Sequence, residues 1–385
     1  MENRMDQDRI LDYEKYVEEH KEETLALLKE WAAIPAPSHQ EEKRAQAVKE
    51  WLEKQGAEGV RIDEAGNVVY ELGCEEAEQV VIFMAHTDVV FPDETPFVIR
   101  EEDGKLYAPG IGDDTANLVQ LMMAVKYILE RGFKPAKGLG LVFVANSCEE
   151  GLGNLKGCRE ICRVWGKKMK TFYSLDGYLG WAVTKAVGSQ RYKVTVRTEG
   201  GHSYSAFGNP NAIHILAGLI QTLYSVRLPE GAKTTYNIGT IEGGTTINSI
   251  AQEASMTYEF RSEDHGCLAY MEAFFESAVQ SMGKAGWDVE VEVLGIRPCN
   301  KDVDELEQEK VTAGCLKVLE RYCEAGARTK ASSTDANIPL SMGIPSCTVG
   351  CVKGAKSHTR EEWIEADSMT VGQKVAFGLV LPYVM

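Results

Sequence analysis

Residues 79–92 read QVVIFMAHTDVVFP: a largely apolar run, then a histidine and an aspartate two positions apart, then apolar residues again. A short, continuously apolar run is typical of a strand that is buried on both faces. Residues 139–146 (LGLVFVAN) and 171–176 (TFYSLD) repeat this pattern, and residues 116–132 show apolar residues at helical spacing. Apolar strands that alternate with helices predict an α/β domain whose mostly parallel sheet is covered by helices on both faces.

A change of hydrophobic period near residue 187 predicts a second domain. Residues 191–199 (RYKVTVRTE) alternate strictly between polar and apolar, as in a half-exposed strand. The predicted elements that follow give the order β-α-β-β-α-β, which is the ferredoxin-like unit. We therefore expect an inserted domain at residues 187–296 and a discontinuous first domain, residues 1–186 with 297–385.

Two local signals refine the first domain. Ser38 is followed three positions later by Glu41, which predicts a capping box ahead of a helix that ends near Gly56. The dipeptide Asp103-Gly104 predicts the turn of a hairpin over residues 97–108.

Composition excludes several classes of partner. The formal net charge of −17 opposes binding to nucleic acid or to anionic lipid, because both depend on Lys and Arg neutralising phosphate. The apolar runs are too short to span a bilayer. The first residues, MENRMDQDRILDYEKYVEEHKEE, are acidic and lack the zones of a secretory signal, so we expect a cytoplasmic protein. Ten cysteines without a C-x-x-C pair are expected to be reduced thiols rather than metal ligands.

Side chains that can bind metals follow the predicted buried strands and the hairpin. In open α/β sheets, sites assemble beyond the carboxyl ends of the strands. Two histidines with several carboxylates suit zinc, or manganese or cobalt in its place. There are more carboxylates than one ion needs, so the cluster implies two divalent ions that offset the mutual repulsion. The candidate residues are His86, Asp88, Asp113, Asp114, Glu149, Glu150, Asp176 and His358.

Each of these motifs alone has a plain structural explanation. A histidine at a strand end is commonly just hydrogen-bonded, and paired acids are common on solvated loops; their joint placement after apolar strands favours a metal site. At a strand period of two, His86 and Asp88 share a face, so Asp88 can accept a hydrogen bond from the ring nitrogen that does not bind metal. Other histidines are expected on the surface or on a helix without a role: His20, His39, His265 and His214.

The order of five motifs resembles the co-catalytic dizinc exopeptidase and deacylase family that includes peptidase T, carboxypeptidase G, aminoacylase and succinyl-diaminopimelate desuccinylase, with peptidase T-like members the most similar. The motifs are HTD (86–88), GDD (112–114), EEGLGNLKG (149–157), LDG (175–177) and SHT (357–359). The resemblance runs from about residue 20 to the C-terminus. It implies that the inserted domain serves as a lid and a dimerisation domain.

The resemblance also implies roles for single residues. His86 and Asp176 would hold one metal ion, Glu150 and His358 the other, with Asp113 bridging the two and Glu149 as the general base. Two positions depart from peptidase T, since Thr115 and Asn117 stand where that protein has lysine and glycine.

Three residues of the inserted domain have a functional and a structural interpretation. GGHSYSAFGNPNAI (200–213) resembles the family segment whose histidine reaches the partner's active site, so His202 is a catalytic candidate; the alternative is a turn histidine beside two glycines. Asn248 and Arg261 stand where relatives bind the substrate's carboxylate or polar backbone, and a guanidinium suits such a contact. The alternative for Arg261 is a solvated arginine on the polar face of its strand, together with Glu259.

These observations predict a dinuclear metal-dependent amidohydrolase, an exopeptidase that hydrolyses small peptides and forms a homodimer. An N-acyl amino acid deacylase needs the same metals and base with a different acyl pocket, so it is the alternative. A non-catalytic binding protein on the same fold is a further alternative. It is opposed by the presence of Glu149 and of every ligand position.

Overall fold

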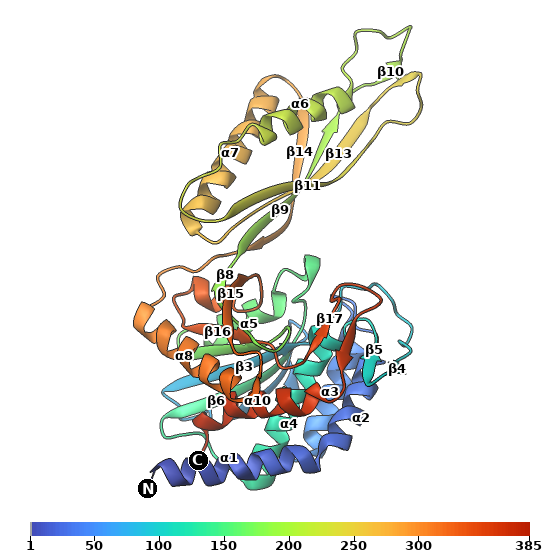
Figure 1. Ribbon diagram of the computed structural model, residues 1–385. Coiled ribbons are helices and arrows are strands. Elements are labelled where there is room, and N and C mark those ends of the chain that lie inside the picture. Colours follow the sequence, from blue (N-terminus) through green and yellow to red (C-terminus); the bar gives the residue numbers. More distant parts are fainter. Residues whose placement is uncertain (1) are drawn as a thin grey trace. The chain divides into compact units, whose positions relative to one another are not determined.

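The computed structural model describes residues 2–385, and the side chains of residues 7–385. The chain divides into two compact units (Figure 1). The larger unit comprises Met1–Ala186 and Lys301–Met385, and the smaller unit comprises Val187–Asn300. Residues 297–300, which the sequence assigned to the first domain, therefore belong to the smaller unit, because its last strand extends to Arg297.

A mixed sheet of eight strands forms the centre of the larger unit. Strands β6, β3, β7 and β16 are parallel to one another, and β1 and β2 at one edge pair antiparallel. At the other edge β8 is antiparallel to β16 and parallel to β15. In sheet order the strands are β1 (Arg61–Ile62), β2 (Val68–Leu72), β6 (Leu139–Asn146), β3 (Gln79–His86), β7 (Met169–Leu175), β16 (Ser346–Val349), β8 (Trp181–Ala186) and β15 (Arg328–Ser332). This arrangement confirms the predicted mostly parallel sheet.

Both faces of this sheet are buried, because alternate residues of β3 enter two different hydrophobic clusters. Val81 and Phe83 face the first cluster, and Ile82 and Met84 face the second. The first is completed by α1 (Glu2–Glu19), α2 (Lys21–Ala32), α3 (Glu42–Lys54), α4 (Ala116–Arg131), α8 (Glu305–Tyr322) and α10 (Ser368–Val380), with the turn η3 (Leu381–Tyr383). The second is completed by α5 (Lys156–Trp165) and α9 (Asn337–Ser341). Helices on both faces explain why β3 is continuously apolar.

A second, small sheet lies in the same unit and carries the predicted hairpin. Its order is β17 (Gly354–Ala355), β18 (Trp363–Glu365), β5 (Lys105–Tyr107) and β4 (Arg100–Glu102). Asp103 and Gly104 have φ of 49° and 74°, the left-handed pair that a tight hairpin turn requires. The pairing of β18 with β5 brings the C-terminal segment beside η1 (Ile111–Thr115), the short turn that follows the hairpin.

The predicted capping box is wrong. Helix α3 begins at Glu42 without a side-chain cap. Ser38 instead donates its hydroxyl to Asp88 Oδ2 at 2.6 Å, and Glu41 Oε1 accepts from the main-chain nitrogen of Cys148 at 2.9 Å. Both side chains contact buried polar groups of distant segments, and local sequence spacing does not predict such contacts.

The smaller unit has the predicted ferredoxin-like order. Its antiparallel sheet runs β11 (Thr234–Gly243), β13 (Glu253–Ser262), β9 (Gly188–Arg197), β14 (Asp288–Arg297), packed with α6 (Ala212–Tyr224) and α7 (His265–Lys284). Met256, Tyr258 and Phe260 of β13 are buried, as their alternation predicted. A short ribbon of β10 (Gly201–His202) and β12 (Ser249–Ile250) belongs to the same unit. Within residues 2–385, no helix has both the length and the hydrophobicity needed to cross a membrane.

Candidate active site

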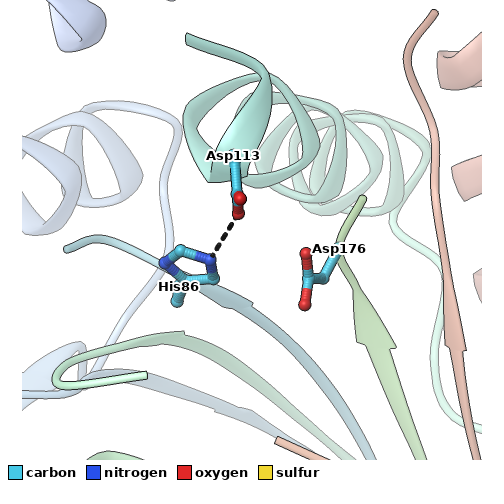
Figure 2. A group of neighbouring side chains, drawn as sticks. All are labelled: His86, Asp113 and Asp176. Atoms are coloured by element: carbon cyan, nitrogen blue, oxygen red, sulfur yellow. Dashed lines mark hydrogen bonds and ion pairs between the residues drawn. The ribbon is translucent and has the colours of Figure 1, made fainter. Parts of the chain in front are cut away.

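A first group of three side chains that could hold a metal ion lies at the carboxyl ends of the parallel strands and in the adjoining turn η1. His86 is the last residue of β3, Asp176 directly follows β7, and Asp113 lies in η1. One ligand atom of each lies within 4.8 Å of the others. His86 Nε2 is 3.2 Å from Asp113 Oδ1, and the Asp176 carboxylate lies beside them (Figure 2).

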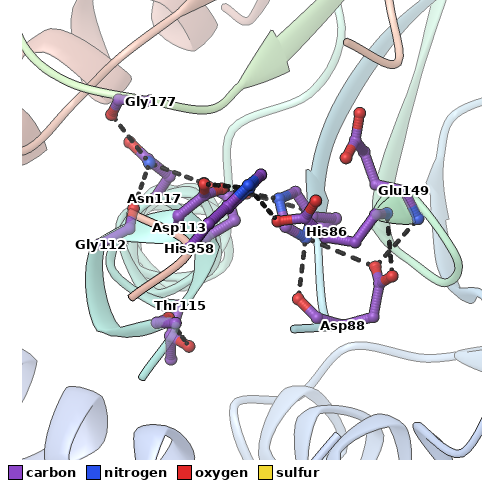
Figure 3. A network of polar contacts seen from close by, with 12 residues as sticks. His86, Asp88, Gly112, Asp113, Thr115, Asn117, Glu149, Gly177 and His358 are labelled. Atoms are coloured by element: carbon purple, nitrogen blue, oxygen red, sulfur yellow. Dashed lines mark hydrogen bonds and ion pairs between the residues drawn. The ribbon is translucent and has the colours of Figure 1, made fainter. Parts of the chain in front are cut away.

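A second group shares Asp113 with the first. Asp113, Glu150 and His358 again place ligand atoms within 4.8 Å of one another. His358 Nε2 is 3.3 Å from Asp113 Oδ2 and 2.9 Å from Glu150 Oε1. The two oxygens of Asp113 thus face different histidines (Figure 3). This is the geometry of a carboxylate shared between two adjacent sites.

Asp88 holds the loop that carries the paired glutamates. Its carboxylate, which is 0% exposed, accepts from the main-chain nitrogens of Glu149 at 2.9 Å and Glu150 at 3.0 Å (Figure 3). His86 Nδ1 lies 3.0 Å from the main-chain oxygen of Asp88 and 3.4 Å from its carboxylate. His86, Glu149 and Glu150 form a third group of ligand atoms within 4.8 Å. Asp88 therefore contacts both the histidine and the glutamate loop.

Glu362 positions Asp113, and the sequence interpretation missed it. Its carboxylate accepts three main-chain hydrogen bonds, from Gly110 at 2.7 Å, Gly112 at 2.9 Å and Asp113 at 2.8 Å. Gly110 has φ of +71°, and a Cβ on Gly112 would lie 3.0 Å from Glu362 Oε1, so this close approach requires glycine. The available signal was an acid four residues after His358 and directly before the strand that begins at Trp363.

Asp114, the neighbour of Asp113, belongs to none of the three groups. Its carboxylate accepts from the main-chain nitrogen of His86 at 2.9 Å and from Asn117 Nδ2 at 2.6 Å. Asn117 also accepts from the main-chain nitrogen of Cys351 at 2.8 Å. The departure from peptidase T at residue 117 thus supplies a buried amide that joins this turn to the segments of Gly177 and Cys351.

Arg44 is a buried cation behind this region and was also missed. It is 0% exposed and donates to the main-chain oxygen of Thr87 at 2.8 Å and to Thr115 Oγ1 at 3.2 Å. Burial lowers the pKa of Arg44 to about 10, while Asp88 and Glu41 oppose this shift. The second departure from peptidase T, Thr115, therefore contacts a buried guanidinium.

Burial and the charges of neighbouring groups shift the pKa values of the candidate ligands. Burial, followed by the charge of Asp113, raises the pKa of Asp176 to about 8. Burial also raises the pKa of Glu150 to about 7, although its hydrogen bond with His358 opposes this. Hydrogen bonds to Asp113 and Glu150 raise the pKa of His358 to about 10. Burial opposes a charge on His86, but the surrounding aspartates outweigh it and raise its pKa well above the usual range.

This donor set fits a pair of divalent cations. Without a cation, the buried carboxylates are kept close together only by binding protons, on themselves or on the two histidines. Imidazole nitrogens and carboxylate oxygens are the ligands that zinc and similar ions bind, and metal binding displaces the protons. Two overlapping groups of three ligands with one shared aspartate provide room for two ions.

His202, Asn248 and Arg261 lie in the smaller unit. His202 is exposed, and its Nδ1 accepts from the main-chain nitrogen of Tyr204 at 3.2 Å. Asn248 is exposed in the adjoining turn, where its main-chain oxygen accepts from Ser203 at 3.0 Å. Arg261 donates two hydrogen bonds of 3.1 Å to the neighbouring carboxylate of Glu259. His202 and Asn248 are thus neighbours.

The remaining histidines lie outside the ligand groups. His39, His214 and His265 are exposed, as expected. His20 is half-buried and stacks on Tyr16 with ring centroids 3.8 Å apart, so it is a packed residue rather than a surface one.

We expect Glu362→Gln to weaken metal binding. The amide group presents an N–H2 where the carboxylate accepted main-chain hydrogen bonds, so Asp113 loses its support, and affinity should fall about 10- to 100-fold. Isothermal titration with zinc measures the change. Glu361→Gln, at the exposed neighbouring position, is the matched control and should bind as wild type does. Equal affinity in both variants would contradict a positioning role for Glu362.

We expect the metal-free protein to lose stability as pH rises from 6 to 8.5. Glu150, Asp176 and both histidines have raised pKa values in the folded state, so their contribution is present at low pH and lost as pH rises through those values. Hydrogen bonds with the histidines lower the pKa of Asp113 despite burial, so its contribution is lost only under more acidic conditions. The melting temperature should fall by about 5 °C.

Scanning calorimetry in chelator measures this dependence. Zinc-loaded protein is the control, since bound cations should remove most of the dependence on pH. A melting temperature of metal-free protein that rises between pH 6 and 8.5 would show that the cluster is not the source of the titration.

With this geometry described, comparison with known proteins defines the class. The sequence profile of peptidase family M20/M25/M40 matches residues 82–381. The chain belongs to this family, and it is a metal-dependent hydrolase of peptide or amide bonds. The match spans the ligand groups and the smaller unit alike.

Individual relatives share the length of the chain at low identity. A succinyl-diaminopimelate desuccinylase of Corynebacterium glutamicum is 26% identical over 349 residues, covering 88% of this chain and 90% of that protein. The aminopeptidase PepT of Bacillus cereus has a similar structure, with a TM-score of 0.70 and 23% identity over 94% of this chain and 98% of that one. A tripeptidase of Staphylococcus aureus gives a TM-score of 0.73 and 22% identity, covering 94% and 97%. The two structures share the fold.

Proposed function

We propose that the chain is an exopeptidase that hydrolyses small peptides with two divalent ions. His86 and Asp176 hold one ion, Glu150 and His358 hold the other, and Asp113 is shared. The observation that carries the proposal is the placement of Asp113, whose two oxygens face the two histidines at 3.2 and 3.3 Å. The mixed histidine and carboxylate ligands favour zinc, with manganese or cobalt as substitutes.

Side chains of the protein then transfer the proton and hold the base in place. When bound, divalent ions lower the pKa of water and polarise a carbonyl group. Glu149 accepts the proton of the attacking water and returns it to the departing amine, so an amide becomes a carboxylate and a free amine. The main-chain hydrogen bonds from Glu149 and Glu150 to Asp88 hold the base beside its neighbouring ligand. Ser38 completes this support by donating to the same carboxylate.

Small peptides are the favoured substrates. The similar structures include an aminopeptidase and a tripeptidase, which supports a peptidase. The desuccinylase relative supports the alternative, an N-acyl amino acid deacylase with the same metal ligands and base. In either case Asn248 and Arg261 are proposed to bind the polar backbone or carboxylate of the substrate.

A substrate panel tests the proposal. Zinc-reconstituted protein is assayed against di- and tripeptides and against N-acyl amino acids, with release of a primary amine as the readout. Preferential turnover of peptides is expected. Preference for N-acyl amino acids would select the deacylase. No turnover of any amide would leave the non-catalytic binding protein as the better description.

The smaller unit is proposed to act as a lid and dimerisation domain of a cytoplasmic homodimer, with His202 reaching the active site of the partner subunit. No disulfide joins any of the ten cysteines in the described chain, which suits a reducing compartment. His202 lies exposed on a ribbon, so its ring is available to another molecule.

We expect inactive His202→Ala and Glu149→Ala proteins to regain activity when mixed and allowed to exchange subunits. Each mixed dimer then has one site that contains both an intact base and an intact partner histidine. Random exchange should restore about a quarter of the wild-type rate per site, because half of the dimers are mixed and each has one intact site. A mixture as inactive as its components would contradict the role of His202 across the dimer. His214→Ala, at another exposed histidine, is the control.

A further inference from the structure

Asp335 and Asn146 form a buried polar pair in the larger unit. Asn146 ends β6 and lies level with His86 of β3, and Asp335 immediately precedes the α9 region. Asn146 is 0% exposed and Asp335 is 1% exposed. Asn146 Nδ2 donates to Asp335 Oδ2 at 2.7 Å. The proposed chemistry gives this pair no role.

One carboxyl oxygen of Asp335 and the amide oxygen of Asn146 each lack a hydrogen-bond donor. Asp335 Oδ1 and Asn146 Oδ1 are both buried, and neither has a hydrogen-bond partner among the described residues. Buried polar atoms without partners are rare and costly. An ionised carboxylate can only accept hydrogen bonds, whereas a protonated one also has an O–H donor. A proton on Asp335 would therefore supply a donor to a pair whose two unpartnered oxygens can otherwise only accept.

The surroundings favour that proton. Burial, followed by the charge of Glu149, raises the pKa of Asp335 well above its ordinary value, and Asp176 adds to this. His86 and the hydrogen bond from Asn146 oppose the shift without overcoming it. From α5, the thiol of Cys158 donates to the main-chain oxygen of Asp335 at 3.2 Å.

We propose that Asp335 is an uncharged positioning residue whose carboxyl group forms a cyclic pair with Asn146, donating O–H to Asn146 Oδ1 and accepting N–H on Oδ2. The main-chain oxygen of Asn146 accepts from both the nitrogen and the hydroxyl of Thr87 at 2.8 Å. Thr87 thus joins the ends of β3 and β6, and the side-chain pair holds this end of β6 to the segment before α9. His86 and the loop of Glu149 leave from these ends, and no further negative charge is added to the site.

Its effect on catalysis rests on the proposed function, but its protonation does not. Asp335→Asn replaces the O–H with N–H2 and keeps both hydrogen bonds, so the metal-loaded variant should stay within about threefold of wild-type kcat/KM. Asp335→Ala removes both bonds and should lower kcat/KM at least about tenfold. Asp302→Asn, at an exposed aspartate, is the control and should match wild type.

Infrared difference spectroscopy detects the proton on the carboxyl group of Asp335 directly. At neutral pH, zinc-loaded wild-type protein, in which the metal has displaced the protons of the ligand carboxylates, should show the carbonyl band of a protonated carboxyl group, and zinc-loaded Asp335→Asn should lose that band. Absence of the band overturns the proposal even if no substrate is ever found. A loss of more than about 100-fold in kcat/KM by folded Asp335→Asn also overturns it, since Asp335 would then act as a carboxylate.

A double variant in which the acid and the amide exchange positions tests the pairing even if a single variant fails to fold. Asn146→Asp with Asp335→Asn moves the acid to the other side of the same cyclic pair. The double variant should recover the metal content and melting temperature that Asn146→Asp alone loses. No recovery, with Asp335→Asn itself folded, would contradict the pairing.

Discussion

Glu149→Gln should lower kcat/KM by about 100- to 10,000-fold, the range by which general bases contribute to catalysis. Glutamine keeps the size of the side chain but cannot take a proton from water. The main-chain hydrogen bond from residue 149 to Asp88 does not involve the side chain, so the loop should stay in place. Kinetics on the best substrate of the panel, with metal content measured in the same sample, provide the test.

Metal content separates the two roles open to Glu149. A ligand atom of Glu149 lies within 4.8 Å of ligand atoms of His86 and Glu150, so the geometry alone would allow Glu149 to be a metal ligand. If Glu149 is only the base, the variant keeps two bound ions per chain while its kcat/KM falls. A variant that loses an ion would identify Glu149 as a ligand. Glu94→Gln, at an exposed site, controls for the purification and should behave as wild type.

Asp113→Asn should remove metal and activity together, lowering zinc affinity by well over the roughly 10- to 100-fold that is typical of a residue that only supports a ligand. Asparagine offers one neutral oxygen where the carboxylate presented one oxygen to each group. The negative charge between the two cations also disappears, so the binding of both ions should be weaker. Elemental analysis after dialysis and zinc titration measure the loss.

The matched control is Asp103→Asn. Asp103 is an exposed turn residue in the left-handed region, where asparagine fits equally well. It should retain two ions. If Asp113→Asn also retains two ions with wild-type affinity, the two groups do not share this aspartate, and the dinuclear proposal fails.

The candidate ligand positions could be predicted because they depend on local order. A buried strand must be apolar, so a histidine or an acid at its carboxyl end is visible in the sequence, as at His86 and Asp176. Parallel strands bring their carboxyl ends to one edge, which places these residues together before any coordinates are known. The strict alternation of β13 likewise predicted which of its residues enter the core.

The supporting residues could not be predicted in this way. Glu362 binds main-chain nitrogens some 250 residues away, and Ser38 donates to Asp88 rather than capping its helix. Each contact joins segments whose approach is set by packing, so no spacing along the chain encodes it. Arg44 looked like an ordinary helical arginine and is fully buried.

By itself, the sequence determined the α/β architecture, the inserted ferredoxin-like order and the residues able to bind cations, because the period of apolar side chains and the polar residues that end it are local properties. Only the tertiary structure decided which oxygen of Asp113 faces which histidine, that Asp114 lies outside the ligand groups, and that Asp335 contacts Asn146. Those facts depend on side chains from separate segments meeting in a space closed to water, where each donor must find an acceptor.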